Sequence, residues 1–332
     1  QPALTAMRRF LARRTGAAVV ELVRRGIKPS DIMTEAAFQN AVTLLASIGG
    51  SLNALLHLPA IAHELGLNVT WAQVAETTSR VPLVTNITPN GDMSCINLYK
   101  AGGVPAVMKT IEKDLDTSCM TINGKTVGEN LEADIKIDRS VIRTQDDPAS
   151  VANGIQVLYG NLAPEGTLVK TSAVPEDQHT FDGPAMCFNS EEECFAAYNE
   201  HRIPAGTAVI IRYEGPKGGP GMKELHRVTE IMKGIPGSAV ITDGRFSGAS
   251  GGLSVGYLCP EAAEGGPIAL IQDGDMVHIN LEDNAISFDI TDEELEARRQ
   301  NWTPVVHDFK GKVLGRYLKE VGPAKDGALL GA

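Results

Sequence analysis

Two glycine-rich loops carry the side chains best suited to chemistry. In the first, residues 209–222 read VIIRYEGPKGGPGM, so an apolar stretch typical of a buried strand runs into four glycines and two prolines in residues 215–221. Glu214 stands where the strand should end, a position suited to a working carboxylate or to a ligand of a hard cation. Free main-chain N–H groups there favour an anion, and Lys217 adds positive charge. The spacing GxxxxGK[ST] is absent, which argues against ATP or GTP hydrolysis, and the remaining alternative is an ordinary turn with a solvated glutamate.

The second loop follows another apolar stretch and is rich in hydroxyls. Residues 239–252 read AVITDGRFSGASGG and contain Ser247, Gly248 and Ser250. The last five of these residues match the GxSxG pattern of serine hydrolases, but that motif needs a strand directly before it and a helix directly after it. Here the strand should end near residue 242 and residues 253–257 look extended. We therefore disfavour a serine hydrolase and expect these hydroxyl and N–H groups to face a small, oxygen-rich substrate.

A third glycine-containing segment precedes an apolar helix. Residues 47–57 read SIGGSLNALLH, which places Ser51 and Asn53 within capping range of the helix that follows. Either an anion-binding helix terminus or plain capping explains the pattern. His57 and His63 are six residues apart and do not share a helix face, so we interpret them as packing or surface residues rather than metal ligands.

The elements that position these loops fall into two regions, as a chain of 332 residues predicts. Residues 1–138 are expected to be mostly helical, with one short buried strand at 81–85. The polar segment 134–149 contains Pro148 and is the best candidate boundary. Beyond it, short apolar runs between Gly and Asp predict a barrel or closed sheet. Strands are expected at 156–159, 167–171, 207–213, 239–242, 268–272, 276–280 and 285–290, with helices at 191–199, 222–233 and 292–300.

Composition excludes several classes of protein. Hydrophobic residues make up 43% and charged residues 21% of the chain, so it can bury cores and is not intrinsically disordered. A net charge of −11 argues against nucleic-acid binding, and no apolar run approaches the roughly 18 residues of a membrane span. The five cysteines form no CxxC pair, which favours reduced thiols in a cytoplasmic compartment. The Arg-rich segment 7–28 favours a surface helix over a transit peptide, which would apply only to an organellar protein.

Six segments together resemble the dihydroxy-acid and sugar-acid (aldonic acid, phosphogluconate) dehydratase family. The similarity runs in the family's order along nearly the whole chain, and RYEGPKGGPGM and GRFSGAS are closest to the dihydroxy-acid dehydratase branch. The segments are residues 49–66, 101–109, 159–174, 209–224, 241–256 and 260–275.

The resemblance implies an α/β protein: a remnant of an α/β/α domain over residues 1–138, then a swivelling β-barrel-like β/β/α domain over residues 139–332. It also implies dehydration of a 2,3-dihydroxy acid to a 2-keto acid by a homodimer that uses an iron–sulfur cluster and Mg²⁺. Glu214 would be a Mg²⁺ ligand and Ser247 the base at C2. The residues expected to contact the small dihydroxy or sugar acid are Lys217, Gly248, Ser250, Ser51 and Asn53. The cluster cysteines belong to an N-terminal half that this sequence does not contain, so the chain is expected to be the C-terminal portion of such an enzyme.

Three residues depart from the family pattern and leave the fine specificity open. Leu52 stands where the family usually has Thr, and Tyr257 and Cys259 stand where His and Ser are usual. An aldonic-acid dehydratase is the alternative within enzymes. From another class, the alternative is a catalytically empty fragment or binding module.

Overall fold

The computed structural model describes residues 6–150, 154–247, 252–305 and 313–331. The chain divides into two compact units. The first comprises residues 1–50, 61–69 and 76–154, and the second comprises residues 51–60, 70–75 and 155–332. Helices α4 (Ala54–Glu64) and α5 (Trp71–Thr78) therefore each contribute residues to both units.

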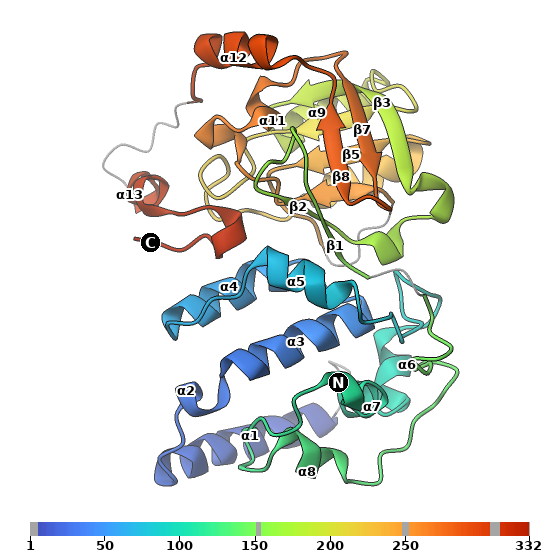
Figure 1. The fold of residues 1–332 in the computed structure, drawn as a ribbon, viewed down its shortest axis with the longest axis vertical. Helices are drawn as coiled ribbons and strands as arrows, with labels where there is room; N and C mark the ends of the chain where they lie inside the picture. Colours follow the sequence, from blue (N-terminus) through green and yellow to red (C-terminus); the bar gives the residue numbers. More distant parts are fainter. Residues whose placement is uncertain (1–5, 151–153, 248–251, 306–312, 332) are drawn as a thin grey trace. The chain divides into compact units, whose positions relative to one another are not determined.

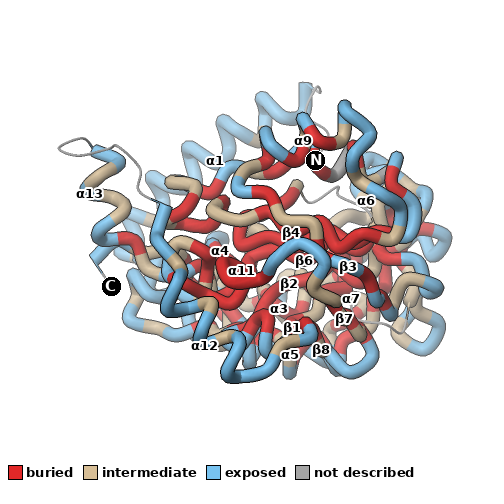
Figure 2. The backbone as a smooth tube through the Cα atoms, turned by 90° about the horizontal axis from the view of Figure 1, so that it is seen from above, coloured by how far each residue is buried: buried red, intermediate tan, exposed pale blue. Residues whose placement is uncertain are grey.

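The first unit is helical. Thr34 caps helix α3, because its hydroxyl accepts the N–H of Ala37 at 3.3 Å, and Gly49 ends that helix with φ 59°. Helix α1 contains no buried residue and is pale blue along most of its length in Figure 2. The elements of this unit, apart from its parts of α4 and α5, are α1 (Ala6–Arg24), α2 (Pro29–Ile32), α3 (Glu35–Ile48), α6 (Cys95–Lys100), α7 (Gly103–Thr110), the 3₁₀ turn Glu112–Asp114 and α8 (Val127–Leu131).

The strand expected at residues 81–85 does not form. Leu83 and Thr85 make single bridges to Ser150 and Ile142, respectively. These partners lie eight residues apart, whereas a continuous ladder needs partners two residues apart, so the pairing cannot propagate. The described part of the first unit thus contains bridges but no strand.

The second unit is built on an eight-stranded, nearly closed barrel-like sheet with the order β1-β2-β6-β5-β4-β3-β7-β8 (Figure 1). A bridge between Tyr159, which follows β1, and Ala285 of β8 links the two ends of the sheet. Strands β3 to β6 pair in parallel and the other pairs are antiparallel. The strands are β1 (Gln156–Leu158), β2 (Thr167–Val169), β3 (Thr180–Phe188), β4 (Ala208–Ile211), β5 (Ala239–Thr242), β6 (Ser254–Gly256), β7 (Met276–Asn280) and β8 (Ala285–Phe288).

Helices cover this sheet and connect its strands. The expected helix at 222–233 is shorter than predicted, and the expected strand at 268–272 is wrong, because Gly266 and Pro267 start a buried helical turn there. The helices are α9 (Glu191–Asn199), α10 (His226–Ile231), α11 (Pro267–Leu270), α12 (Asp292–Asn301) and α13 (Val313–Glu320), with 3₁₀ turns at Thr171–Ala173, Glu176–Gln178, Met232–Gly234, Ala262–Glu264 and Ala324–Asp326. No helix among the described residues is both long and apolar enough to cross a membrane.

Strands β4 and β5 are buried on both faces, as their continuous apolar sequences predict. Ile210 and Ile241 point into the barrel core, whereas Val209 and Val240 belong to a second cluster with residues of α9 and α10. This double burial holds the two strands rigidly, and the polar loops of the candidate site begin where they end.

Candidate functional site

The two glycine-rich loops start side by side. Strands β4 and β5 are parallel neighbours in which Ile211 pairs with Thr242, so both loops leave the same edge of the sheet. The loops meet again further on, because Glu224 and Arg245 form a parallel bridge and the N–H of Leu225 donates to the Arg245 carbonyl at 2.8 Å. The carboxyl edge of parallel strands is a usual place for ligand sites.

Asp243 anchors the start of both loops. It is completely buried, and its carboxylate accepts main-chain N–H groups from Tyr213 (3.1 Å), Glu214 (2.9 Å) and Ala262 (2.8 Å). Burial raises the pKa of this carboxyl, and the three N–H donors act against that rise. Tyr213 has a left-handed φ of 63°, a conformation that costs a non-glycine residue free energy. The Asp243 bonds hold that turn in place.

Glu214 lies buried against the main chain. Its Oε1 accepts the N–H of Glu191 at 2.9 Å and lies 3.5 Å from the Nζ of Lys223. Burial raises its pKa, while the Glu191 N–H and the Lys223 ammonium lower it. A Cβ at Gly244 would come within 2.7 Å of the Glu214 side chain, so only glycine allows this close approach.

Glu261 holds the glycine-rich loop that follows Glu214 in place. Its carboxylate accepts the N–H groups of Lys217 at 3.0 Å and Gly218 at 2.8 Å. Burial, and then the nearby Asp243 carboxylate, raise the pKa of Glu261 to about 7. The position of the loop thus depends on a carboxyl group that titrates near neutral pH.

This raised pKa predicts a specific pH dependence of stability. Since the pKa of Glu261 in the folded state is about 7 against an ordinary value of 4.5, its stabilising contribution is complete below pH 4.5 and is lost as the pH rises through 7. The loss is on the order of 3 kcal/mol in the free energy of unfolding. We expect Glu261→Gln to flatten this part of the pH profile in urea denaturation between pH 5 and pH 8. The exposed Glu282→Gln should keep the wild-type slope, and an unchanged slope in Glu261→Gln would contradict the assignment.

Asn53 ties the segment before α4 to both loops. Its Nδ2 donates to Oε1 of Glu224 at 2.7 Å, and its Oδ1 accepts the Tyr257 hydroxyl at 2.5 Å and Nη1 of Arg245 at 3.3 Å. The Ser51 hydroxyl accepts the N–H of Asn53 at 3.3 Å. The Asn53 side chain therefore joins a polar network instead of capping α4.

Comparison with known proteins decides the family. Residues 1–130 match the family model described as dihydroxy-acid/6-phosphogluconate dehydratase N-terminal, and residues 140–328 match the corresponding C-terminal model. The chain belongs to the dihydroxy-acid/6-phosphogluconate dehydratase family. The expectation that it represents only the C-terminal portion is corrected, because it includes sequence of both domains.

Curated members of the dehydratase family are similar along almost the whole chain. The dihydroxy-acid dehydratases of Moorella thermoacetica, Clostridium kluyveri and Clostridium beijerinckii are 44%, 45% and 46% identical to it, over 99% of the chain in each case. The chain spans about 60% of the length of these relatives.

The structure places some of the predicted site residues where the two loops meet and others away from that point. Glu214 and Asn53 lie at the meeting point of the two loops, and Ser247 is half-buried two residues beyond Arg245. The Lys217 ammonium pairs with Glu264. Gly248 and Ser250 lie outside the described residues.

The acidic residues that hold the two loops together, Asp243 and Glu261, are not singled out by the sequence patterns above. Asp243 carried a usable signal, since a polar residue directly after a buried strand and before glycine often faces a site. Glu261 carried none, because an acidic residue in the segment PEAAEGG is expected at the surface, whereas it is 5% exposed.

The described residues do not fit the family's metal groups by themselves. No group of three or more His, Cys, Asp or Glu side chains among them is arranged to hold a metal ion. The cysteines are dispersed, and burial raises the pKa of Cys187, Cys194 and Cys259 to about 12, which keeps these thiols protonated. Glu214 shares the Lys223 ammonium with Glu191 and Glu192, which lie 3.8 and 2.9 Å from that ammonium, so the negative charge of Glu214 is already partly neutralised.

Proposed function

We propose that the natural protein containing this chain dehydrates a 2,3-dihydroxy carboxylic acid, of the branched kind used in amino-acid biosynthesis, to a 2-keto acid. The observation that carries this proposal is the pairing of the Glu214 and Ser247 loops on adjacent parallel strands. Relatives named dihydroxy-acid dehydratase are 44–46% identical to the chain over 99% of its length, which supports the same reaction for it.

The proposed reaction needs no net oxidation or reduction. A base removes the proton at C2, and the electron pair of that C–H bond forms the C2=C3 double bond as the C3–O bond breaks. The departing hydroxide takes up one proton, which balances the one removed, and leaves as water, and the resulting enol tautomerises to the keto acid. We assign the base to Ser247, and contacts to the substrate oxygens to Gly248, Ser250, Lys217 and Ser51. An ordinary serine hydroxyl is far too weak a base, so Ser247 would act only where a nearby metal ion stabilises its alkoxide. Asn53 would act as a positioning residue, since its amide is bonded to groups on both loops.

The family resemblance implies an iron–sulfur cluster and Mg²⁺. Because the described residues do not form either site, we derive no step through these groups. We propose that the cluster ligands come from outside this chain and that Glu214 is the one Mg²⁺ ligand the chain contributes.

The remaining architecture is proposed on the same resemblance. Residues 1–138 would be part of an α/β/α domain, and residues 139–332 would be a swivelling domain that carries both loops. We propose a cytoplasmic homodimer.

Product analysis tests the proposed function. The natural protein, purified anaerobically, is offered 2,3-dihydroxyisovalerate, arabonate and gluconate, and 2-keto acid formation is measured. We expect kcat/KM for dihydroxyisovalerate to exceed the other two by at least about tenfold, since a pocket shaped for a branched apolar acid excludes a polar chain. Preference for a sugar acid would favour the aldonic-acid alternative, and no keto acid from any of the three would favour a binding module.

A further inference from the structure

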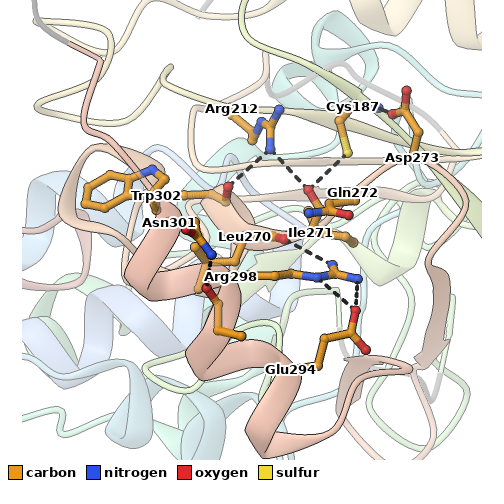
Figure 3. A pocket seen from close by; sticks show the side chains of 12 residues that line it. Cys187, Arg212, Leu270, Ile271, Gln272, Asp273, Glu294, Arg298, Asn301 and Trp302 are labelled. Atoms are coloured by element: carbon orange, nitrogen blue, oxygen red, sulfur yellow. Dashed lines mark hydrogen bonds and ion pairs between the residues drawn. The ribbon is translucent and has the colours of Figure 1, made fainter.

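A cavity of 680 Å³ opens among strand β3, the residue after β4, the segment that includes α11, and helix α12 (Figure 3). Its lining includes Cys187, Arg212, Gln272, Arg298 and Trp302. None of its residues belongs to the polar network of Asp243, Glu261 and Asn53. The cavity therefore needs an explanation of its own.

Arg212 brings an unneutralised positive charge to this cavity. The side chain is half-buried, its Nε donates to Oδ1 of Asn189 at 3.0 Å, and its Nη1 donates to the carbonyls of Ala269 at 3.3 Å and Ile271 at 3.2 Å. All three acceptors are neutral. No carboxylate among the described residues lies within 4 Å of this guanidinium, and its Nη2 has no acceptor among them. The lining also holds the carboxylate of Asp273, but this residue is exposed to solvent and accepts the N–H of Cys187 at 2.7 Å. A half-buried guanidinium that no described carboxylate contacts is costly, so the Arg212 side of the cavity favours an anion.

The second cation of the lining is already neutralised. Arg298 binds Asp275 with both terminal nitrogens, at 2.5 and 3.0 Å, and also contacts Glu294 at 2.5 Å. The Cys187 thiol is uncharged, since burial raises its pKa to about 12. One free guanidinium edge suits a monoanion better than a dianion such as phosphate, which usually draws several positive groups.

The rest of the wall combines polar side chains, among them Asp273 and Asn301, with an apolar part that is fixed in place. The indole of Trp302 donates from Nε1 to the Tyr213 hydroxyl at 3.3 Å, and its ring packs so closely on Gly265 that a Cβ there would lie 3.0 Å away. Leu270 and Ala297 add aliphatic surface. Cavities of this size that combine apolar surface with a few fixed polar groups are typical of small organic ligands.

We propose that this cavity binds a small organic monocarboxylate with a flat apolar or aromatic body. The carboxylate would bond to Nη2 of Arg212, and the body would lie against Trp302. This site is independent of the proposed dehydratase reaction.

Tryptophan fluorescence tests the proposal with benzoate as the probe. The sequence has two tryptophans, and Trp71 is buried with its Nε1 bonded to the Leu55 carbonyl, so Trp71→Phe leaves Trp302 as the single reporter. We expect saturable quenching by benzoate, at least tenfold weaker binding of the neutral analogue benzamide, and no displacement of benzoate by equimolar inorganic phosphate. Arg212→Gln should weaken benzoate binding at least tenfold, whereas Arg202→Gln, an exposed arginine paired with Glu200, should not change it.

A second pair of variants tests the proposal even if Arg212→Gln does not fold. Gln272 is exposed at the rim of the cavity, so Gln272→Glu and Gln272→Lys should both fold. We expect the glutamate to weaken benzoate binding and the lysine to strengthen it, each by about threefold or more, because a charge at the rim acts on the bound anion. Absence of saturable quenching, equal affinity for benzamide and benzoate, or equal affinity in the two Gln272 variants would overturn the proposal.

Discussion

Replacement of Asp243 by alanine is expected to lower the free energy of unfolding by about 3–5 kcal/mol, because three buried main-chain N–H groups lose their acceptor at once. The donors belong to Tyr213, Glu214 and Ala262. The turn at Tyr213 and the segment at Ala262 therefore lose the carboxylate that binds them both. Asp243→Asn should fall between alanine and wild type, since one amide oxygen still accepts while the NH₂ group faces donors. Urea denaturation followed by circular dichroism measures the effect.

The control for this experiment is Asp177→Ala. Asp177 is exposed, lies in the same unit and is expected to change stability by less than about 0.5 kcal/mol. A loss below about 1 kcal/mol in Asp243→Ala would mean that the three N–H groups find other acceptors, and it would remove Asp243 as the anchor of the loops.

The sheet could be predicted from sequence where local signals are unambiguous. Strands β4 and β5 are short apolar runs that end in glycine-rich loops, and both were expected within a few residues of their bounds. Helix α11 was misread as a strand because a short apolar run fits either element. Strand β3 was missed because Gly183 and Pro184 interrupt it. The strand changes partner at this point, pairing with β7 up to Pro184 and with β4 from Ala185.

The sequence allows the two loops of the candidate site to be predicted, but not the hydrogen bonds that join them. Glycine content and strand-end position singled out Glu214 and Ser247, since these are local properties of the chain. The contacts of Asn53 with Glu224 and Tyr257 join residues 171 and 204 positions apart, and no local pattern encodes such pairs. Burial of Glu261 is likewise a consequence of tertiary packing.

Replacement of Ser247 by alanine in the natural protein is expected to lower kcat by about 10²–10⁴-fold, the usual contribution of a positioned general base. A base acts only as the proton moves, so KM should change little. Ser247 is half-buried and its loop is held by the Glu224–Arg245 bridge and the Asp243 bonds, which do not involve the hydroxyl. Folding should therefore be retained. Ser287→Ala, which removes a half-buried hydroxyl on β8, is the matched control and should keep wild-type kcat.

The role of Ser247 is tested most directly by the rate of 2-keto acid formation by the Ser247→Ala protein at saturating dihydroxyisovalerate, beside wild type and Ser287→Ala. We expect a rate below about one hundredth of wild type, with unchanged KM and an unchanged urea midpoint. A rate above about one tenth of wild type in a folded Ser247→Ala protein would contradict that role, because the loop after β5 would then not supply the group that removes the C2 proton.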